Sequence, residues 1–240
     1  MKIVVDKKYR FLGDVIASLP CLMDEGQGET VYDSRNRVVH FSHNGLSLMV
    51  KRFKRVNAIQ KVVYSFFRKT KAERAFLFAE EFAKRGIDTP QRVAYIEEKH
   101  AGFFDTGYFI SIEAQGTETS LLLREVQDYP KDLAEAVAQQ VVFMHSKGIL
   151  HGDLNLSNFL CTQDDEGYHF TMIDINRSHF CDGMPSDEDC LKNMVRLTHR
   201  RDLYEDLIRR YAKLRGWDAD STAHRALALL DRFENRKFKL

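Results

Sequence analysis

The sequence lacks long apolar runs, and no segment approaches the ~20 consecutive apolar residues that a membrane-spanning helix needs. It also lacks paired cysteines, because its four cysteines form neither a CxxC pair nor a Cys/His spacing typical of zinc ligands. They are Cys21, Cys161, Cys181 and Cys190. We therefore expect reduced thiols rather than disulfides or a zinc site. With 44% apolar and 30% charged residues, the 240-residue chain should form a globular protein.

Charge of one sign is not in excess either. The formal net charge is +1, so the overall field favours no particular partner, and we expect no nucleic acid. Residues 1–8 mix Ile3, Val4 and Val5 with Asp6, Lys7 and Lys8, which is too short and too charged for a signal peptide. We therefore expect a cytoplasmic protein.

A distinctive loop is present at residues 151–160, with the sequence His-Gly-Asp-Leu-Asn-Leu-Ser-Asn-Phe-Leu. Asp153 and Asn158 have the spacing of the H-R-D-x-x-x-x-N loop of kinases, with Gly152 at the position of the Arg. Phosphoryl transfer requires an acceptor oxygen in line with the phosphorus and neutralised phosphate charge. We expect Asp153 to deprotonate an acceptor hydroxyl, Asn158 to hold Mg²⁺ on ATP, and His151 to support the loop.

A second carboxylate, Asp174, follows a short apolar run at residues 170–173. The turn residues around Gly167 predict a hairpin between residues 160–163 and 169–173, which would bring Asn158 near Asp174. Mg²⁺ prefers oxygen ligands, and both side chains offer oxygen. Asn158 and Asp174 are therefore the predicted metal ligands.

The first part of the chain predicts a small antiparallel sheet. Residues 1–30 should contain a short strand followed by a loop-rich stretch around Pro20, and residues 31–41 a strand with a polar turn at 34–36. Asn44-Gly45 is typical of a hairpin turn, and residues 46–53 follow as the next strand.

Lys51 lies late in this last strand, where kinases carry the lysine that binds the α- and β-phosphates. Because side chains alternate along a strand, Lys51 should share a face with Met49 and Phe53, opposite Val50 and Arg52. A solvated strand lysine is the alternative. No G-x-G-x-x-G precedes Lys51, so the turns at residues 34–36 or 26–28 are the candidates to cover the phosphates.

Two helices are predicted next, at residues 56–67 and from 70 or 71 to about 85, where Gly86 ends the second. Glu73 and Glu80 lie on nearly one face of this second helix. Either is a candidate partner for Lys51, and Glu73 is favoured because it lies near the helix start. A surface glutamate is the alternative for both.

The segment from Lys51 to Arg74 is rich in cations and also carries Phe53, Tyr64, Phe66 and Phe67. Such a segment is compatible with contact with an anionic substrate or with peripheral contact with the inner membrane. A solvated helix face over a packed one is the more common explanation.

Strands are expected at residues 93–97 and 107–113, followed by a linker at Ala114, Gln115 and Gly116 whose backbone groups can bind adenine. Glu113 and Gln115 are the expected nucleotide-binding positions there. The remainder predicts a helix opened by Pro130 and three further helices at residues 187–200, 203–214 and 221–233. The fold class is therefore α+β and protein-kinase-like. It has a nucleotide-binding lobe at 1–113, with a small sheet and one or two helices, and a reduced, mostly helical catalytic lobe at 114–240.

The chain resembles the lipopolysaccharide core kinase (Kdo/WaaP) family of the protein-kinase-like superfamily, from about residue 40 to about residue 215. The residues that carry the resemblance are those at 48–53, 86–90, 145–154, Asn158 and 172–177. This resemblance implies ATP-dependent phosphorylation of a sugar hydroxyl on the lipopolysaccharide inner core, usually of Kdo or heptose. It assigns Lys51 to the phosphates, Glu73 to Lys51, Asp153 as base, and Asn158 and Asp174 to Mg²⁺.

Two departures from protein kinases matter for this resemblance. Asn155 stands where many protein kinases carry a catalytic-loop lysine, and the glycine-rich loop is missing. Gly152 in place of Arg also argues against control by activation-loop phosphorylation. The alternatives are a RIO-like atypical protein kinase, an aminoglycoside-type small-molecule kinase, and a pseudokinase that binds a partner.

Overall fold

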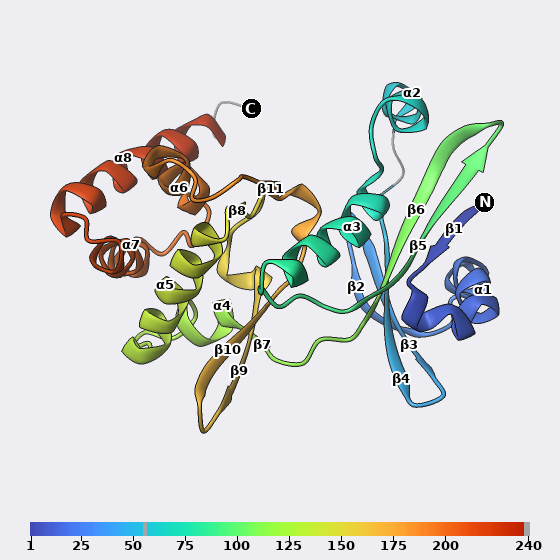
Figure 1. Cartoon of the computed structure of the whole chain (residues 1–240), viewed down its shortest axis with the longest axis horizontal. Helices are drawn as coiled ribbons and strands as arrows, with labels where there is room; N and C mark the ends of the chain where they lie inside the picture. Colours follow the sequence, from blue (N-terminus) through green and yellow to red (C-terminus); the bar gives the residue numbers. More distant parts are fainter. Residues whose placement is uncertain (55–56, 238–240) are drawn as a thin grey trace. The chain divides into compact units, whose positions relative to one another are not determined.

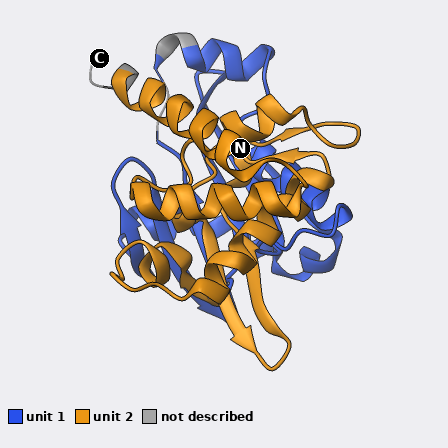
Figure 2. Cartoon of the chain, turned by 90° about the vertical axis from the view of Figure 1, so that its left-hand side faces the viewer, with its two compact units in different colours: residues 1–114 blue, residues 115–240 orange. Residues whose placement is uncertain are grey.

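The computed structural model describes residues 1–54 and 57–237, and these divide into two compact units, Met1–Ala114 and Gln115–Leu240. Figure 1 shows the course of the chain and Figure 2 distinguishes the units by colour. The division lies next to the boundary expected between residues 113 and 114. The predicted α+β class is confirmed, since helices and antiparallel strands both contribute extensively.

Unit 1 is built on an antiparallel six-stranded sheet with the order β1-β5-β6-β4-β3-β2. Its strands are β1 (Lys2–Val5), β2 (Glu29–Asp33), β3 (Arg37–His43), β4 (Leu46–Arg52), β5 (Arg92–His100) and β6 (Phe103–Ile112). The predicted turns at residues 34–36 and at Asn44-Gly45 both connect neighbouring strands, with positive φ at Asn44 and Gly45.

One face of this sheet packs against α1 (Gly13–Asp24), where a loop-rich stretch was expected. That prediction is wrong, although Pro20 lies inside the helix and cannot donate a backbone hydrogen bond. The helix forms because Ile16, Leu19 and Met23 recur at helical spacing and are fully buried against the sheet. Burial of this stripe outweighs the ~3 kcal/mol that an interior proline typically costs.

The other face of the sheet packs against α3 (Lys71–Lys84), through a core formed by Phe53, Ala72, Ala75, Phe76 and Tyr95. Thr70 caps this helix by accepting the N–H of Glu73, and Gly86 ends it with a φ of 76°. Before it comes α2 (Ala58–Phe66), whose predicted start at Val56 lies outside the described residues.

Unit 2 is mostly helical. Its helices are α4 (Thr119–Leu123), α5 (Lys131–Ser146), α6 (Asp187–Met194), α7 (Arg201–Leu214) and α8 (Ala219–Lys237). The predicted hairpin is confirmed as β9 (Phe159–Asp164) with β10 (Gly167–Met172), and β7 (Thr117–Glu118) extends it to three strands. A short ladder joins β8 (Ile149–Leu150) to β11 (His179–Phe180).

The predicted helix at residues 187–200 is wrong at its end, because α6 stops at Met194. The chain then leaves the helix, and the carbonyl oxygen of Leu197 accepts the N–H of Leu156 at 3.0 Å. This bond ties the segment after α6 to the loop at residues 151–160.

The first testable prediction concerns the buried stripe of α1. Leu19→Ala removes a side chain that is 1% exposed, so we expect a loss of about 2–5 kcal/mol in the free energy of unfolding. Leu121→Ala, at a leucine that is 53% exposed, is the matched control and should change little. Chemical denaturation followed by circular dichroism is the measurement, because the single tryptophan, Trp217, lies in unit 2. Equal losses in the two variants would contradict this account of α1.

Candidate active site

Residues 151–158 connect β8 to β9 and end in a short 3₁₀ turn at Leu156–Asn158. Asn155 caps this turn, since its Oδ1 accepts the N–H of Ser157 at 2.9 Å. Asn158 is 9% exposed and donates from Nδ2 to the backbone oxygen of Asp153 at 2.7 Å. Because Nδ2 is used within the loop, Oδ1 of Asn158 is the atom suited to a cation.

His151 is fully buried and joins this loop to the strand end that carries the second aspartate. Its Nδ1 accepts the N–H of Asp153 at 3.1 Å, and its Nε2 lies 3.0 Å from the carbonyl oxygen of Ile173. A backbone N–H only donates and a carbonyl only accepts, so these two bonds require a neutral ring with its proton on Nε2. Burial lowers the pKa of His151, which favours this neutral form.

Asp174 follows Ile173 in a left-handed backbone conformation, with φ 57° and ψ 38°. The N–H of Ile173 donates to the carbonyl oxygen of Asn158 at 3.0 Å, so the two predicted metal ligands come from backbone segments that are directly bonded. The side chain of Asn176 donates to Oδ1 of Asp174 at 2.6 Å. Left-handed φ in a residue other than glycine is uncommon and is often found at functional sites.

Gly152 stands at the position of the arginine of protein kinases, and there is a steric reason for a glycine here. A Cβ atom at this position would overlap the carbonyl oxygen and the Cβ of Arg177. The backbone after Asp174 therefore lies directly against Gly152, and this close approach excludes any side chain there. The sequence alone offered no sign of this contact.

A chain of buried and half-buried polar groups supports the loop from the helical side. Asn193 of α6 donates to the carbonyl oxygen of His151 at 2.7 Å, and its Oδ1 lies 3.1 Å from Nε2 of His145. The other nitrogen of His145 lies 2.9 Å from the hydroxyl of Tyr211, which accepts a bond from Arg215. Burial lowers the pKa of His145 to about 4, so this ring is also neutral.

The carboxylate of Asp153 meets a cation that the sequence analysis did not identify. Nη1 of Arg196 lies 2.9 Å from Oδ1 of Asp153, and the two side chains are 41% and 27% exposed. Forty-three residues separate them in the sequence, so no local pattern could have indicated the pair.

In unit 1, Lys51 occupies the face of β4 that the alternation predicted. Val50 belongs to the core under α1, whereas Phe53 belongs to the core under α3. The ammonium group of Lys51 lies 5.5 Å from the centre of the Phe53 ring. In contrast, Arg52 lies on the α1 side and pairs with Asp24 at 2.5 Å.

The two candidate glutamates of α3 have different surroundings. Glu80 forms ion pairs with Lys84 and Arg92, at 3.0 and 2.7 Å. Glu73 interacts electrostatically with Lys2 and Tyr95. Since Glu80 is already held by two cations, Glu73 remains the preferred partner, and its pairing with Lys51 stays a prediction.

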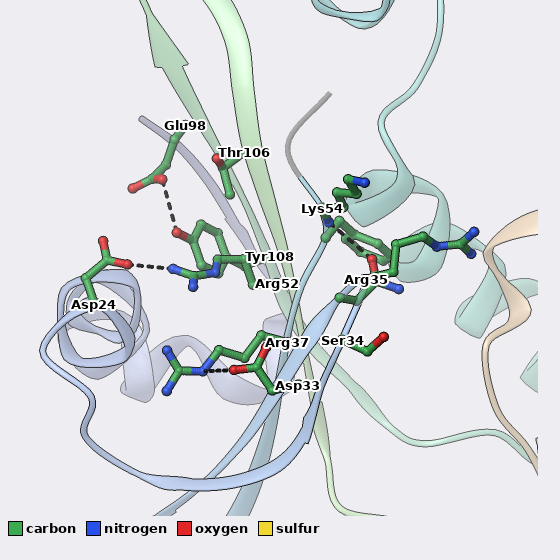
Figure 3. Close-up of a pocket in the computed structure, with 12 residues that line it drawn as sticks. Asp24, Asp33, Ser34, Arg35, Arg37, Arg52, Lys54, Glu98, Thr106 and Tyr108 are labelled. Atoms are coloured by element: carbon green, nitrogen blue, oxygen red, sulfur yellow. Dashed lines mark hydrogen bonds and ion pairs between the residues drawn. The ribbon is translucent and has the colours of Figure 1, made fainter. Parts of the chain in front are cut away.

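The turn at residues 34–36, a candidate to cover the phosphates, lines a pocket of about 360 Å³ in unit 1 (Figure 3). Oδ1 of Asn36 accepts the N–H of Lys54 at 3.1 Å, which ties the turn to the end of β4. Figure 3 shows the Arg52–Asp24 ion pair and Tyr108 on another wall of this pocket. Burial raises the pKa of Tyr108 to about 12, so its hydroxyl stays protonated. The role of this turn in binding phosphate stays a prediction.

The segment expected to bind adenine, at Glu113 and Gln115, lies at the end of unit 1 and the start of unit 2. The N–H of Glu113 donates to the carbonyl oxygen of Ser47 at 2.9 Å. Its nucleotide contacts stay a prediction.

In residues 1–54 and 57–237, no helix combines the length and apolar character that crossing a bilayer requires. Nor does that part of the chain hold a cluster of three His, Cys, Asp or Glu side chains arranged for a metal ion. Mg²⁺ in phosphotransferases is usually bound by one or two carboxylates together with substrate phosphates, and the oxygens of Asn158 and Asp174 fit that donor set.

The second testable prediction concerns Gly152. Gly152→Ala forces the loop away from Arg177, and we expect a loss of about 1–3 kcal/mol in unfolding free energy together with reduced phosphotransfer. Gly13→Ala is the matched control, because no atom lies within 4 Å of a Cβ there and its backbone is helical. Circular dichroism during chemical denaturation follows both variants, and Trp217 fluorescence adds a report on unit 2. A stable and fully active Gly152→Ala variant would contradict the proposed close approach.

The chain is similar to known proteins in its fold and in its sequence. The chain is similar to a solved structure described as "WaaP in complex with acyl carrier protein", over 100% of this chain and 99% of that one. The TM-score is 0.62 and the identity 19%, so this likeness concerns the kinase-like fold alone. No curated protein matches the chain. The model of the "Lipopolysaccharide kinase (Kdo/WaaP) family" matches residues 23–214, and the chain therefore belongs to this family of kinases.

Proposed function

We propose that this kinase uses ATP and Mg²⁺ to phosphorylate a sugar hydroxyl of the lipopolysaccharide inner core, on Kdo or heptose. The observation that carries the proposal is the bonded arrangement of Asp153, Asn158 and Asp174 around the neutral ring of His151. These bonds join the backbone segments that carry one partly exposed carboxylate and two further oxygen-bearing side chains. Family membership supports a lipopolysaccharide acceptor.

Each side chain has one role in this proposal. Asp153 accepts the proton of the attacking hydroxyl, its carboxylate is held by Arg196, and its backbone is held by the loop bonds. Asn158 and Asp174 supply the oxygens that would hold Mg²⁺. The bound ion would neutralise phosphate charge during transfer. In unit 1, Lys51 would bind the α- and β-phosphates and Glu73 would orient it.

The two units divide these tasks in the proposal. Residues 1–113 bind the nucleotide, and residues 114–240 provide the catalytic groups. The backbone around Glu113 and Gln115 would bind the adenine, because a linker of this type exposes amide and carbonyl groups to a ring with complementary donors and acceptors.

The third testable prediction separates the two aspartates. Asp153→Ala should abolish phosphate transfer to Kdo-lipid A while ATP binding is retained, because the base contributes only to the chemical step. Asp174→Ala should remove most of the Mg²⁺-dependent thermal shift given by ATP, because a ligand stabilises only as far as it binds the folded state. Asp165→Ala, in the exposed hairpin turn, is the control for both measurements.

These measurements can also reject the assignment. An unchanged transfer rate in Asp153→Ala would remove it as the base. An unaltered thermal shift in Asp174→Ala would remove that residue as a metal ligand. A wild-type protein that binds ATP with Mg²⁺ but transfers phosphate to no sugar acceptor would favour a pseudokinase.

We also propose peripheral contact with an anionic membrane through an exposed aromatic cluster of unit 1. Phe66 and Phe67 are 68% and 78% exposed, and Phe66 makes an edge contact with Phe103 at 6.0 Å between ring centres. Arg68 and Lys69 line the same pocket as Phe66 and Phe67. Exposed rings beside cations suit an interface where the rings enter the headgroup region and the cations meet lipid phosphates. Phe53 of the same basic segment is buried and takes no part.

The fourth testable prediction concerns this cluster. Wild-type protein should sediment with vesicles of phosphatidylcholine and phosphatidylglycerol more than with phosphatidylcholine alone, and added salt should weaken binding. Phe66→Ser with Phe67→Ser should reduce binding about tenfold or more, because two rings leave the interface. Phe11→Ser is the control, since Phe11 is 72% exposed elsewhere in unit 1. Equal effects of these variants would contradict the proposed surface.

A further inference from the structure

Arg196 follows α6, and its guanidinium group meets the carboxylate of Asp153 from a part of the chain remote in sequence. Nη1 of Arg196 lies 2.9 Å from Oδ1 of Asp153, and both side chains are partly exposed. A guanidinium group has five N–H donors in a planar fork, and this bond uses one of them. The pair therefore borders solvent, where an acceptor and a phosphoryl group can approach.

The segment that carries Arg196 is anchored to the catalytic loop on both sides of Asp153. Asn193 donates to the carbonyl oxygen of His151 at 2.7 Å, and Leu197 accepts the N–H of Leu156 at 3.0 Å. Isolated surface ion pairs are often adventitious because two long side chains meet without further support. Here, bonds from residues 193 and 197 hold the backbone around Arg196 against the loop.

The catalytic loop itself carries no cation. Asn155 occupies the position of the lysine of many protein kinases, and its side chain is neutral. Its Oδ1 accepts the N–H of Ser157 at 2.9 Å, which commits the side chain to the turn. The charge that a lysine would contribute must therefore come from another segment if the loop is to stabilise a phosphoryl group.

We infer that Arg196 supplies this charge: it holds Oδ1 of Asp153 and binds the phosphoryl group during its transfer. This inference rests on the proposed function. In the step concerned, the acceptor oxygen forms a bond to the γ-phosphorus, and the bond to the bridging β–γ oxygen breaks. ADP leaves with that electron pair, and Asp153 takes the hydroxyl proton. Arg196 remains protonated throughout, because arginine does not lose its proton in proteins.

The chemistry of the side chain suits this role better than a lysine at the same site would. The planar fork of arginine can bind a carboxylate and a phosphate oxygen at once, whereas an ammonium group acts as a point charge. The Cζ atom of Arg196 lies 5.1 Å from the centre of the Phe233 ring in α8. This contact of a cation with an aromatic ring gives the guanidinium a further support.

The fifth testable prediction compares Arg196→Gln, which removes the charge, with Arg196→Lys, which keeps it. We expect Arg196→Gln to lower kcat for transfer to Kdo-lipid A by about 10²-fold, with the KM for ATP nearly unchanged. Arg196→Lys should recover part of this loss. ATP hydrolysis with water as acceptor should show the same order of rates. Arg201→Gln is the control, because Arg201 forms a comparable surface pair with Asp231 at 2.7 Å.

A binding measurement separates transition-state contact from a structural role. Arg196→Gln should weaken the complex of ADP, Mg²⁺ and aluminium fluoride about tenfold or more, while ADP with Mg²⁺ binds within about twofold of wild type. Equal weakening of both complexes, or equal losses of kcat in the two Arg196 variants, would overturn the inference. If Arg196→Gln fails to fold, the test uses Arg196→Lys, which should weaken the fluoride complex more than the complex of ADP with Mg²⁺. Wild-type-like binding and kcat in both variants would also overturn the inference. Absence of transfer and hydrolysis in wild type would instead reject the proposed function, while the fluoride measurement still tests Arg196.

Discussion

Two hydrogen bonds to one buried imidazole join the loop of Asp153 to the strand end of Asp174. Both bonds depend on a neutral His151, because its Nδ1 must accept from an amide and its Nε2 must donate to a carbonyl. The burial that lowers the pKa of this ring therefore also secures the geometry. Protonation at Nδ1 would place a donor against the N–H of Asp153 and break that bond. The link between the loop of Asp153 and the strand end of Asp174 therefore depends on the burial that keeps His151 neutral.

The helical side of unit 2 extends this support outward. Asn193 links the carbonyl of His151 to a second neutral histidine, His145, and Tyr211 and Arg215 continue the chain. Asn193, His145 and Tyr211 each donate to one neighbour and accept from another, whereas Arg215 only donates. A network of this kind is stabilising only when every member is satisfied. Loss of the Asn193 amide would therefore remove a partner from the carbonyl oxygen of His151 and from Nε2 of His145.

Two positions that depart from protein kinases, Gly152 and Asn155, have structural explanations in the same unit. Gly152 leaves room for the backbone at Arg177, which brings the segment after Asp174 against the loop. Asn155 forms a local turn instead of carrying charge, and Arg196 approaches Asp153 from the end of α6. The charged groups that meet at Asp153 therefore come from two segments of the chain, the loop at residues 151–158 and the segment after α6.

The sequence by itself determined the hairpin, the strand face of Lys51, the ends of α3 and the family, because these depend on alternation, turn residues, caps and fixed spacings within short segments. It misjudged α1, since Pro20 is a strong local signal and only burial against the sheet outweighs it. It could not find Asn193 or Arg196 or explain Gly152, because those contacts join residues far apart in the chain. Tertiary structure decided them: hydrogen bonds and close packing act between atoms in space, and the local pattern around each residue carries no record of its distant partner.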